Sequence, residues 1–228
     1  MVYGKIMIKK ILFTWSGGKD SALALYQLQK TKKYEISALL TTITEGYNRI
    51  SIHGVRKLLL EKQIKSLGYS FEQVVIPKKA TIEKYESEMA KILKKYCRNK
   101  VLTVAFGDIF LEDLRKYREK KLAKIKMKAM FPIWKQSTKK LANEFIDSGF
   151  KAIITCVDSK ILDKKFVGRE FNKQLLDELP KSVDPCGENG EFHSFVYDGP
   201  IFKKKILFKK GRVVCKKNRF CFCDLIPI

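Results

Sequence analysis

The sequence predicts an α/β fold in which a doubly wound parallel sheet is followed by a smaller C-terminal α+β domain. Three observations predict it. Apolar strand-type runs alternate with helical patterns through the first half of the chain, a glycine turn joins the first run to the first helix, and short apolar runs between turn residues fill the C-terminal end. The 228 residues, 45% of them hydrophobic, suffice for a large α/β domain or for a standard domain with a small one.

The N-terminal half contains four predicted strand and helix pairs. Strands are expected at residues 9–15, 36–43, 71–76 and 101–106. The first helix is indicated by Ala22, Leu25, Tyr26 and Leu28 at helical spacing, and the next three are expected at 55–67, 82–98 and 111–123. This alternation predicts right-handed crossovers and a parallel sheet covered by helices on both faces.

The C-terminal part has a different pattern. A strand at 129–133, a helix at 137–148 and an apolar strand at 152–157 precede a stretch with proline and glycine at 180–200. Short runs at 206–208, 213–215 and 220–226 then predict a small antiparallel meander. We expect a boundary near residue 127, which gives domains 1–127 and 128–228, packed together because no linker of disordered composition separates them.

The chain is strongly basic, with 47 Lys and Arg against 24 Asp and Glu and a formal charge of +23. Such a charge attracts nucleic acid, nucleotides or acidic protein surfaces. Lysine is spread along the chain, however, and only residues 203–219 concentrate nine basic residues without an acid. A dispersed solvated surface therefore explains the charge at least as well, and nucleic-acid binding stays open without being favoured.

Membrane and redox signals are weak. No apolar run approaches the roughly 20 residues that span a bilayer, and residues 1–10 lack the apolar stretch of a secretory signal, so a cytoplasmic protein is expected. The six cysteines form no dense framework and are predicted to be reduced thiols. Cys221 and Cys223 would share one face of a strand, as two buried hydrophobic side chains rather than a metal site.

The most informative motif is the loop Ser16-Gly17-Gly18-Lys19-Asp20-Ser21, placed between the first strand and the first helix. Two glycines allow a close backbone approach, and the free N–H groups and dipole of a helix start favour an anion. Lys19 adds positive charge, and Ser16 and Ser21 add hydroxyl groups. A Walker A loop would need glycine at position 13, which is Phe13. The loop predicts a phosphate site, with a plain glycine turn as the alternative.

This loop resembles the PP-loop of ATP pyrophosphatases, whose members release pyrophosphate and leave AMP on the substrate. Two longer stretches, 107–119 and 184–200, resemble the diphthine–ammonia ligase family within that group, and Phe131-Pro132-Ile133-Trp134 agrees with it. The resemblance covers nearly the whole chain. Residues 44–55, which include His53-Gly54-Val55, look like a shorter His-Gly-Val branch of the family.

The resemblance implies an N-terminal domain of the HUP type, like the adenine nucleotide alpha hydrolases, and a C-terminal domain on the substrate side of the cleft. It implies ATP-dependent amidation of the diphthine carboxylate on elongation factor 2, with ammonium as nitrogen donor. A bacterial source would require another substrate, because diphthamide belongs to archaeal and eukaryotic elongation factor 2. The acceptor is thus a protein or a small carboxylate, and the oligomeric state stays open.

Roles follow for the loop and for a later strand end. The backbone of residues 16–18, Ser21 and Lys19 would bind ATP, with Lys19 stabilising charge that develops on the pyrophosphate. Asp20 would hold Mg²⁺ or fix the loop, and a helix-start carboxylate favoured by the dipole is an equal alternative. Gly107 and Asp108 follow a parallel strand, at the sheet edge where ligands bind, and a surface turn is the competing interpretation.

Both histidines of the chain fall in such segments. His53, Gly54 and Arg56 precede a helix and could meet a phosphate or a substrate carboxylate, although a structural role for His53 is equally consistent. Glu188, Glu191 and His193 are expected to converge and to bind or orient ammonium. A zinc site of Cys186, Glu188 and His193 is disfavoured by the ligand spacing.

The leading hypothesis is therefore an amide ligase that adenylates a carboxylate for attack by ammonia. A second is a tRNA-modifying PP-loop enzyme, which the charge favours and the lack of a C-x-x-C pair opposes. A third is a nucleotide-binding module without ligase activity.

Overall fold

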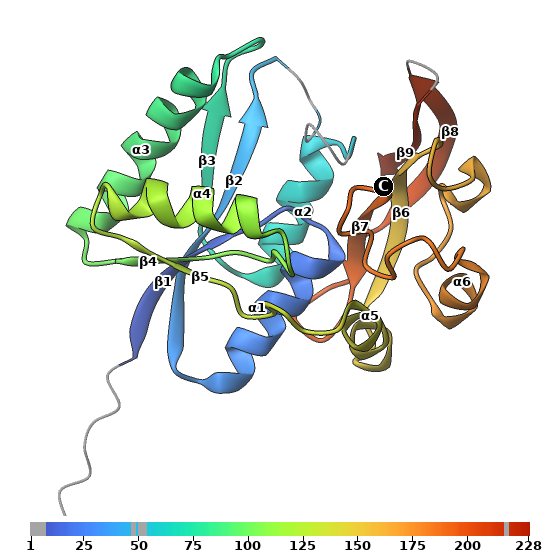
Figure 1. Cartoon of the computed structure of the whole chain (residues 1–228), viewed down its shortest axis with the longest axis horizontal. Coiled ribbons are helices and arrows are strands. Elements are labelled where there is room, and N and C mark those ends of the chain that lie inside the picture. The colour runs from blue at the N-terminus through green and yellow to red at the C-terminus, as the bar shows by residue number, and fades with distance from the viewer. Residues whose placement is uncertain (1–7, 47–48, 50–53, 217–218) are drawn as a thin grey trace, which may run out of the picture.

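Two sheets organise the chain (Figure 1). A computed structural model describes residues 8–46, 49, 54–216 and 219–228. The first sheet is parallel and has the order β3-β2-β1-β4-β5. Its strands are β1 Lys9–Thr14, β2 Tyr34–Thr44, β3 Phe71–Ile76, β4 Thr103–Ala105 and β5 Lys128–Met130. The order reverses between β1 and β4, which is the point where open α/β sheets bind ligands.

Four helices cover this sheet from both sides. Helices α1 Lys19–Thr31 and α2 Lys57–Leu67 lie between the first sheet and the C-terminal domain, and α3 Ile82–Arg98 and α4 Glu112–Ala123 lie on the opposite face (Figure 1). Right-handed crossovers give this arrangement when the strand order reverses. One hydrophobic cluster, which includes Leu12, Leu40 and Leu93, lies under α3 and α4. The larger cluster runs from α1 and α2 into the C-terminal domain.

The C-terminal domain is built on a second, antiparallel sheet with the order β7-β6-β9-β8. Its elements are α5 Thr138–Asp147, β6 Lys151–Asp158, the 3-10 helix η1 Lys164–Phe166, α6 Lys173–Glu178, β7 Phe192–Asp198, β8 Phe208–Lys216 and β9 Phe220–Pro227. The predicted fold class, a parallel doubly wound sheet with a smaller α+β domain, is confirmed.

The elements differ from the predicted ones in the C-terminal half. Strand β7 lies inside residues 180–200, where no strand was predicted. The strand could not be expected from this stretch alone, because its pairing depends on the distant strand β6. Strand β8 is continuous where two short runs were expected, with a register shift between Lys210 and Val213 that spans Gly211. Strand β5 pairs with β4, so the first sheet extends to residue 130, three residues past the expected boundary. The two-domain division at 127 stays a proposal.

The cysteine prediction needs one correction. Cys215 and Cys221 form a disulfide between β8 and β9, rather than staying reduced thiols, because the register of the hairpin places them opposite each other. Cys221 and Cys223 are both buried, as expected for alternate residues of one strand.

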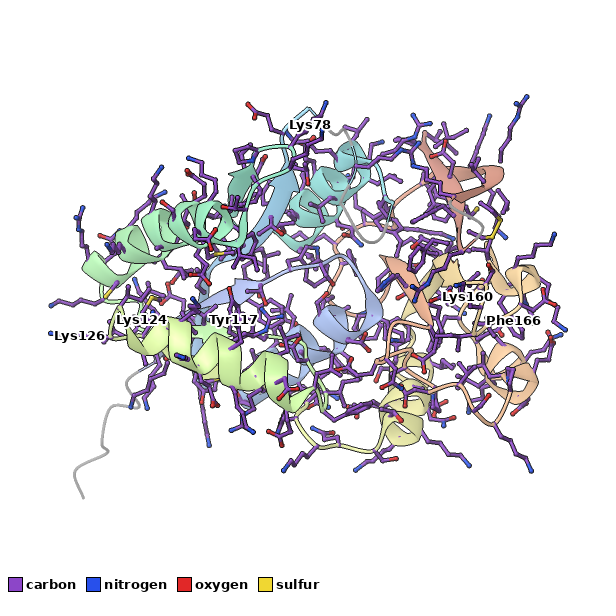
Figure 2. All side chains as sticks on the ribbon, turned by 45° about the horizontal axis from the view of Figure 1, so that its top comes forward. Lys78, Tyr117, Lys124, Lys126, Lys160 and Phe166 are labelled. Atoms are coloured by element: carbon purple, nitrogen blue, oxygen red, sulfur yellow. A yellow bond between two sulfur atoms is a disulfide. The ribbon has the colours of Figure 1, made fainter. Side chains whose placement is uncertain are left out.

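The lysines project over widely separated parts of the molecule, as the labelled Lys78, Lys124, Lys126 and Lys160 show (Figure 2). The basic charge is therefore dispersed over both domains. In the described part of the chain, no helix combines the length and the apolar character needed to cross a membrane.

Candidate active site

A cavity of about 980 Å³ opens at the carboxyl edge of the first sheet. Its walls come from four places: the loop after β1, the ends of β2 and β4, the facing sides of α3 and α4, and the loop that precedes β7. Of the predicted site residues, the cavity is lined by Ser16, Gly18, Lys19, Asp20, Ser21, Gly107, Asp108, Glu188 and His193. Segments 170 residues apart in the sequence thus share one site.

The loop of residues 16–21 has the geometry of an anion cradle. Gly17 adopts a left-handed φ of +81°, and helix α1 begins directly after Gly18, which has no side chain to cap it. The N–H groups in the first turn of a helix have no carbonyl oxygen of a preceding turn to donate to, and the helix dipole favours negative charge there. Ser16 Oγ accepts a hydrogen bond from the Gly18 N–H (3.2 Å) and lies 3.1 Å from Ser21 Oγ. The residues therefore fit a phosphate group.

Lys19 points from this loop toward the C-terminal domain. Its side chain is only 4% exposed, and Nζ donates to both carboxylate oxygens of Asp20 (2.8 and 2.9 Å) and to the carbonyl oxygen of Cys186. The ammonium group also lies 5.3 Å from the ring centre of Phe192. Burial is the largest single effect and lowers the pKa of Lys19, but the charge and hydrogen bond of Asp20 together with nearby Cys186 and Glu188 outweigh it and leave the pKa above its usual value. Lys19 is therefore a charged link between the two halves of the cavity.

Glu188 makes the reciprocal link. Its Oε1 accepts hydrogen bonds from the backbone N–H groups of Ile109 (2.8 Å) and Phe110 (3.4 Å), which follow β4. The pKa of Glu188 is raised to about 7, chiefly by burial, with the charge of Asp20 adding to this effect and the hydrogen bond from Ile109 opposing it. A carboxyl group that titrates near neutral pH is suited to proton transfer.

Glu191 lies behind the cavity wall rather than in it. The residue is 2% exposed, and its Oε1 accepts from the Asp184 N–H (3.0 Å) and from Asn189 Nδ2 (3.1 Å). Asp184 Oδ1 in turn accepts from the N–H groups of Cys186 (2.8 Å) and Glu188 (3.2 Å). Glu188 and His193 both line the cavity, whereas Glu191 holds the shape of the loop that carries Glu188.

Gly107 and Asp108 lie at the edge of the sheet beside the loop of residues 16–21. A Cβ atom on Gly107 would lie 2.9 Å from the backbone nitrogen of Ser21, so only glycine lets β4 and α1 approach this closely. Asp108 forms an ion pair with Arg118 of α4 (2.8 Å), and the Arg118 guanidinium lies 4.3 Å from the ring centre of Phe106.

The segment before α2 does not line the cavity in its described part. His53 lies outside the described residues. Gly54 packs against Phe222, where an added Cβ atom would come within 2.7 Å of the ring. Arg56 forms a bidentate pair with Asp224 of β9 (3.1 and 2.6 Å), and Arg49 binds the same carboxylate (2.8 Å).

Three residues that the sequence did not point to contribute to this region. Arg118 is paired with Asp108, Ser194 Oγ accepts from the Lys19 N–H (3.1 Å), and Gln63 of α2 is fully buried against the loop of residues 16–21. Arg118 and Ser194 lie inside stretches that the resemblance covers. Gln63 could not be recognised from the sequence, because a polar residue on a helix is expected to face solvent, and its burial depends on packing against the second domain.

Metal ligands are sparse. Within the residues that the structure describes, no group of three or more His, Cys, Asp and Glu side chains is arranged to hold a metal ion. The Cys186 thiol donates to the Thr138 carbonyl (3.3 Å), and burial raises its pKa, so it stays a neutral thiol. Asp20 lines the cavity, and one carboxylate beside phosphate groups is a usual arrangement for Mg²⁺.

The sheet order, the loop between β1 and α1 and the facing cavity define an α/β protein of the PP-loop class. Two family models match the chain: the diphthamide synthase N-terminal domain over residues 9–129 and the diphthamide synthase C-terminal domain over residues 137–225. The chain belongs to the diphthamide synthase family.

Curated relatives agree with this family. The diphthine–ammonia ligase of Schizosaccharomyces pombe is 31% identical over 139 residues, which are 58% of this chain and 23% of that protein. The diphthine–ammonia ligases of Bos taurus and Homo sapiens are each 32% identical over 133 residues, or 56% of this chain and 49% of theirs. The chain thus spans about half the length of the Bos taurus and Homo sapiens proteins, and less than a quarter of the Schizosaccharomyces pombe protein.

Among solved structures, the U34-tRNA thiolase NcsA from Methanococcus maripaludis, with its [4Fe-4S] cluster, is similar over 63% of this chain and 60% of its own. The TM-score is 0.37 at 19% identity, which is too weak a likeness to bear on activity.

Proposed function

We propose that this chain is an ATP-dependent ligase that adenylates a carboxylate, releases pyrophosphate and transfers the acyl group to ammonia. One observation carries the proposal: the loop of residues 16–21 and the loop that holds Glu188 face each other across a single cavity, joined by Lys19. Membership of the diphthamide synthase family supports it.

The chemistry requires activation by a nucleotide. Ammonia cannot displace oxide from a carboxylate, because oxide is a very poor leaving group. ATP, when bound, converts that oxygen into part of AMP, which leaves readily. In the proposed reaction the cradle of residues 16–18 and 21 binds the β- and γ-phosphates, and Lys19 stabilises the charge that develops on pyrophosphate.

Asp20 is proposed as the protein ligand of Mg²⁺. Both of its oxygens bind Lys19, and the side chain is 30% exposed toward the cavity. Asp20 would hold the cation, which would supply positive charge to offset the negative charge of the phosphates. Gly107 would allow the nucleotide to approach the edge of the sheet, and Asp108 with Arg118 would hold that edge in place.

Glu188 and His193 are proposed to act on the ammonia side. An ionised Glu188 attracts ammonium and can accept a proton from the attacking nitrogen. Glu191 is proposed to act through the loop, by fixing the position of Glu188. For Arg56 we propose a role in shaping the segment before α2, since it is occupied by Asp224. For His53, which lies outside the described residues, the proposal stays a contact with a phosphate or a substrate carboxylate, with a structural role as the alternative.

The proposed acceptor is the diphthine carboxylate of elongation factor 2, which follows the names of the relatives. Purified protein would be given ATP, Mg²⁺ and ammonium, with or without diphthine-bearing factor. AMP formation that requires both ammonium and the modified factor is the expected result. AMP formation independent of the factor would exclude this acceptor, and AMP formation stimulated by tRNA would favour a tRNA-modifying enzyme instead.

A further inference from the structure

Gln63 is the most completely buried polar side chain near the cavity, with an exposed fraction of 0%. It comes from the middle of α2, a helix that contributes no residue to the cavity wall in the described part of the chain. A buried amide is costly unless its donors and acceptor are satisfied. Its partners therefore show what the side chain holds together.

The three partners of Gln63 belong to two segments, the stretch after β1 and strand β7. Its Oε1 accepts from the indole Nε1 of Trp15 (3.1 Å), directly before the loop of residues 16–21. Its Nε2 donates to the carbonyl oxygen of Gly17 (3.0 Å) and to that of Val196 in β7. Both donor hydrogens and the acceptor are thus in use, and one side chain joins the loop to the C-terminal domain.

The Gly17 carbonyl is held from two sides, since the Val196 N–H also donates to it (2.9 Å). Gly17 has the left-handed φ of +81°, and a Cβ atom there would lie 2.8 Å from Gln63 Oε1. The amide therefore packs against the residue that turns the loop. An apolar side chain of the same length would leave the Trp15 indole N–H without this acceptor.

We infer that Gln63 is a positioning residue that fixes the loop of residues 16–21 in its phosphate-binding conformation and ties that conformation to β7. The inference rests on the proposed function, because it assumes that this loop binds the phosphates of ATP. Gln63 acts through Trp15 and Gly17 and does not touch the nucleotide. Gln63 thereby couples docking of the C-terminal domain to order in the loop of residues 16–21, beside the direct contacts of Gly17 with Val196 and of Lys19 with Ser194 and Cys186.

The experiment compares Gln63→Met with Ser66→Ala in the full chain. Ser66 lies on the same helix and also binds the C-terminal domain, because it accepts from the Lys204 N–H (2.9 Å) and donates to the Lys204 carbonyl, but it does not contact the loop. Calorimetry would give the Kd of ATP and of AMP for each variant. Gln63→Met should weaken ATP binding about tenfold, or about 1.4 kcal/mol, and AMP binding much less, while Ser66→Ala changes both less than about twofold.

A purely structural role predicts a different result, in which both variants lower the melting temperature and neither changes the preference for ATP over AMP. If Gln63→Met binds ATP with the same Kd as the unmodified chain, the inference is overturned and the proposed function is unaffected. If the unmodified chain binds no ATP, the proposed function fails as well, so the two failures are distinguishable.

The indole N–H resonances give a second readout. The chain has two tryptophans, of which Trp15 lines the cavity and Trp134 does not. Because Trp15 reports any anion bound there, the test compares the unmodified chain with Gln63→Met. Inorganic pyrophosphate should slow the exchange of the Trp15 indole proton with water in the unmodified chain, where Gln63 accepts from it, and not in Gln63→Met. Equal slowing in the two proteins would contradict coupling through Gln63.

Discussion

The two loops that face each other across the cavity are built in opposite ways. The loop of residues 16–21 sits between a central strand and a helix, and its turn is set by glycine and by the start of α1. The loop of residues 184–191 has no regular structure and keeps its shape through side chains, with Asp184 and Glu191 binding its backbone N–H groups. The turn of the first loop is set by local sequence and is held further by Gln63 and Val196, whereas the second loop depends on the carboxylates of Asp184 and Glu191.

This difference indicates which substitutions will change the conformation of each loop. The first loop keeps its glycine turn but relies on Gln63 to hold it, whereas the second loop loses its backbone hydrogen bonds when Asp184 or Glu191 is replaced. Lys19 reaches from the first loop to the Cys186 carbonyl of the second, and Glu188 reaches from the second loop to the backbone that follows β4. Substitutions at these two positions therefore test the comparison most strongly.

The largest effect is expected for Lys19→Ala. The variant loses the charge next to the proposed pyrophosphate site and the contact with the Cys186 carbonyl. AMP formation should fall at least about a hundredfold, as when a preorganised charge-stabilising group is removed. Lys30→Ala, at the exposed end of the same helix, is the matched control and should keep full turnover. Turnover retained in Lys19→Ala would show that the loop is not catalytic.

A smaller effect is expected for Glu188→Gln, which keeps an oxygen for the Ile109 N–H and removes the titrating group. With a pKa of about 7, the unmodified enzyme should gain activity as pH rises through neutrality. The variant should lose about tenfold in kcat at pH 8 and show no such rise. Glu178→Gln, an exposed position paired with Arg169, is the control and should keep the profile of the unmodified chain.

The same substitution should change the pH dependence of stability. The ordinary pKa of a glutamate is 4.5, so between pH 4.5 and about 7 the unfolded chain releases the proton that folded Glu188 retains. The contribution of Glu188 to folding stability therefore falls as pH rises through that window. Urea unfolding should show Glu188→Gln gaining stability relative to the unmodified chain between pH 5 and pH 8. An advantage that shrinks with rising pH would contradict the buried environment of Glu188.

The smallest effect on turnover is expected for Asp224→Asn. This carboxylate pairs with Arg49 and Arg56 away from the cavity, and its pKa lies below the usual range, chiefly because of the hydrogen bond from Arg56. Its stabilisation is present above the ordinary aspartate pKa and is lost as pH falls below it. Because the groups are partly exposed, the variant should lose about 1 kcal/mol of unfolding free energy at pH 7 and keep turnover within about twofold. A large loss of ATP binding would instead support a direct role for the Arg56 segment.

The sequence predicted most of the N-terminal domain because strand, turn and helix signals there are local. Strand β3 and helix α3 have the expected bounds, and the glycine turn of residues 16–18 lies between the first strand and the first helix, as predicted. Strand β7 and the Cys215–Cys221 disulfide were missed because both depend on pairing between distant segments. The buried position of Glu191 and the pairing of Arg56 could not be predicted either, since no sequence pattern shows which polar group a charged side chain will meet.

Adenylation is tested directly by labelling the carboxylate oxygen of the acceptor and finding the product that contains the label. Acceptor whose carboxylate carries oxygen-18 would be converted with ATP and ammonium, and the released AMP and pyrophosphate would be analysed by mass spectrometry. Adenylation predicts one oxygen-18 atom in the phosphate of AMP for each amide formed, and none in pyrophosphate. Unlabelled AMP, or label in inorganic phosphate with ADP as the nucleotide product, would contradict it.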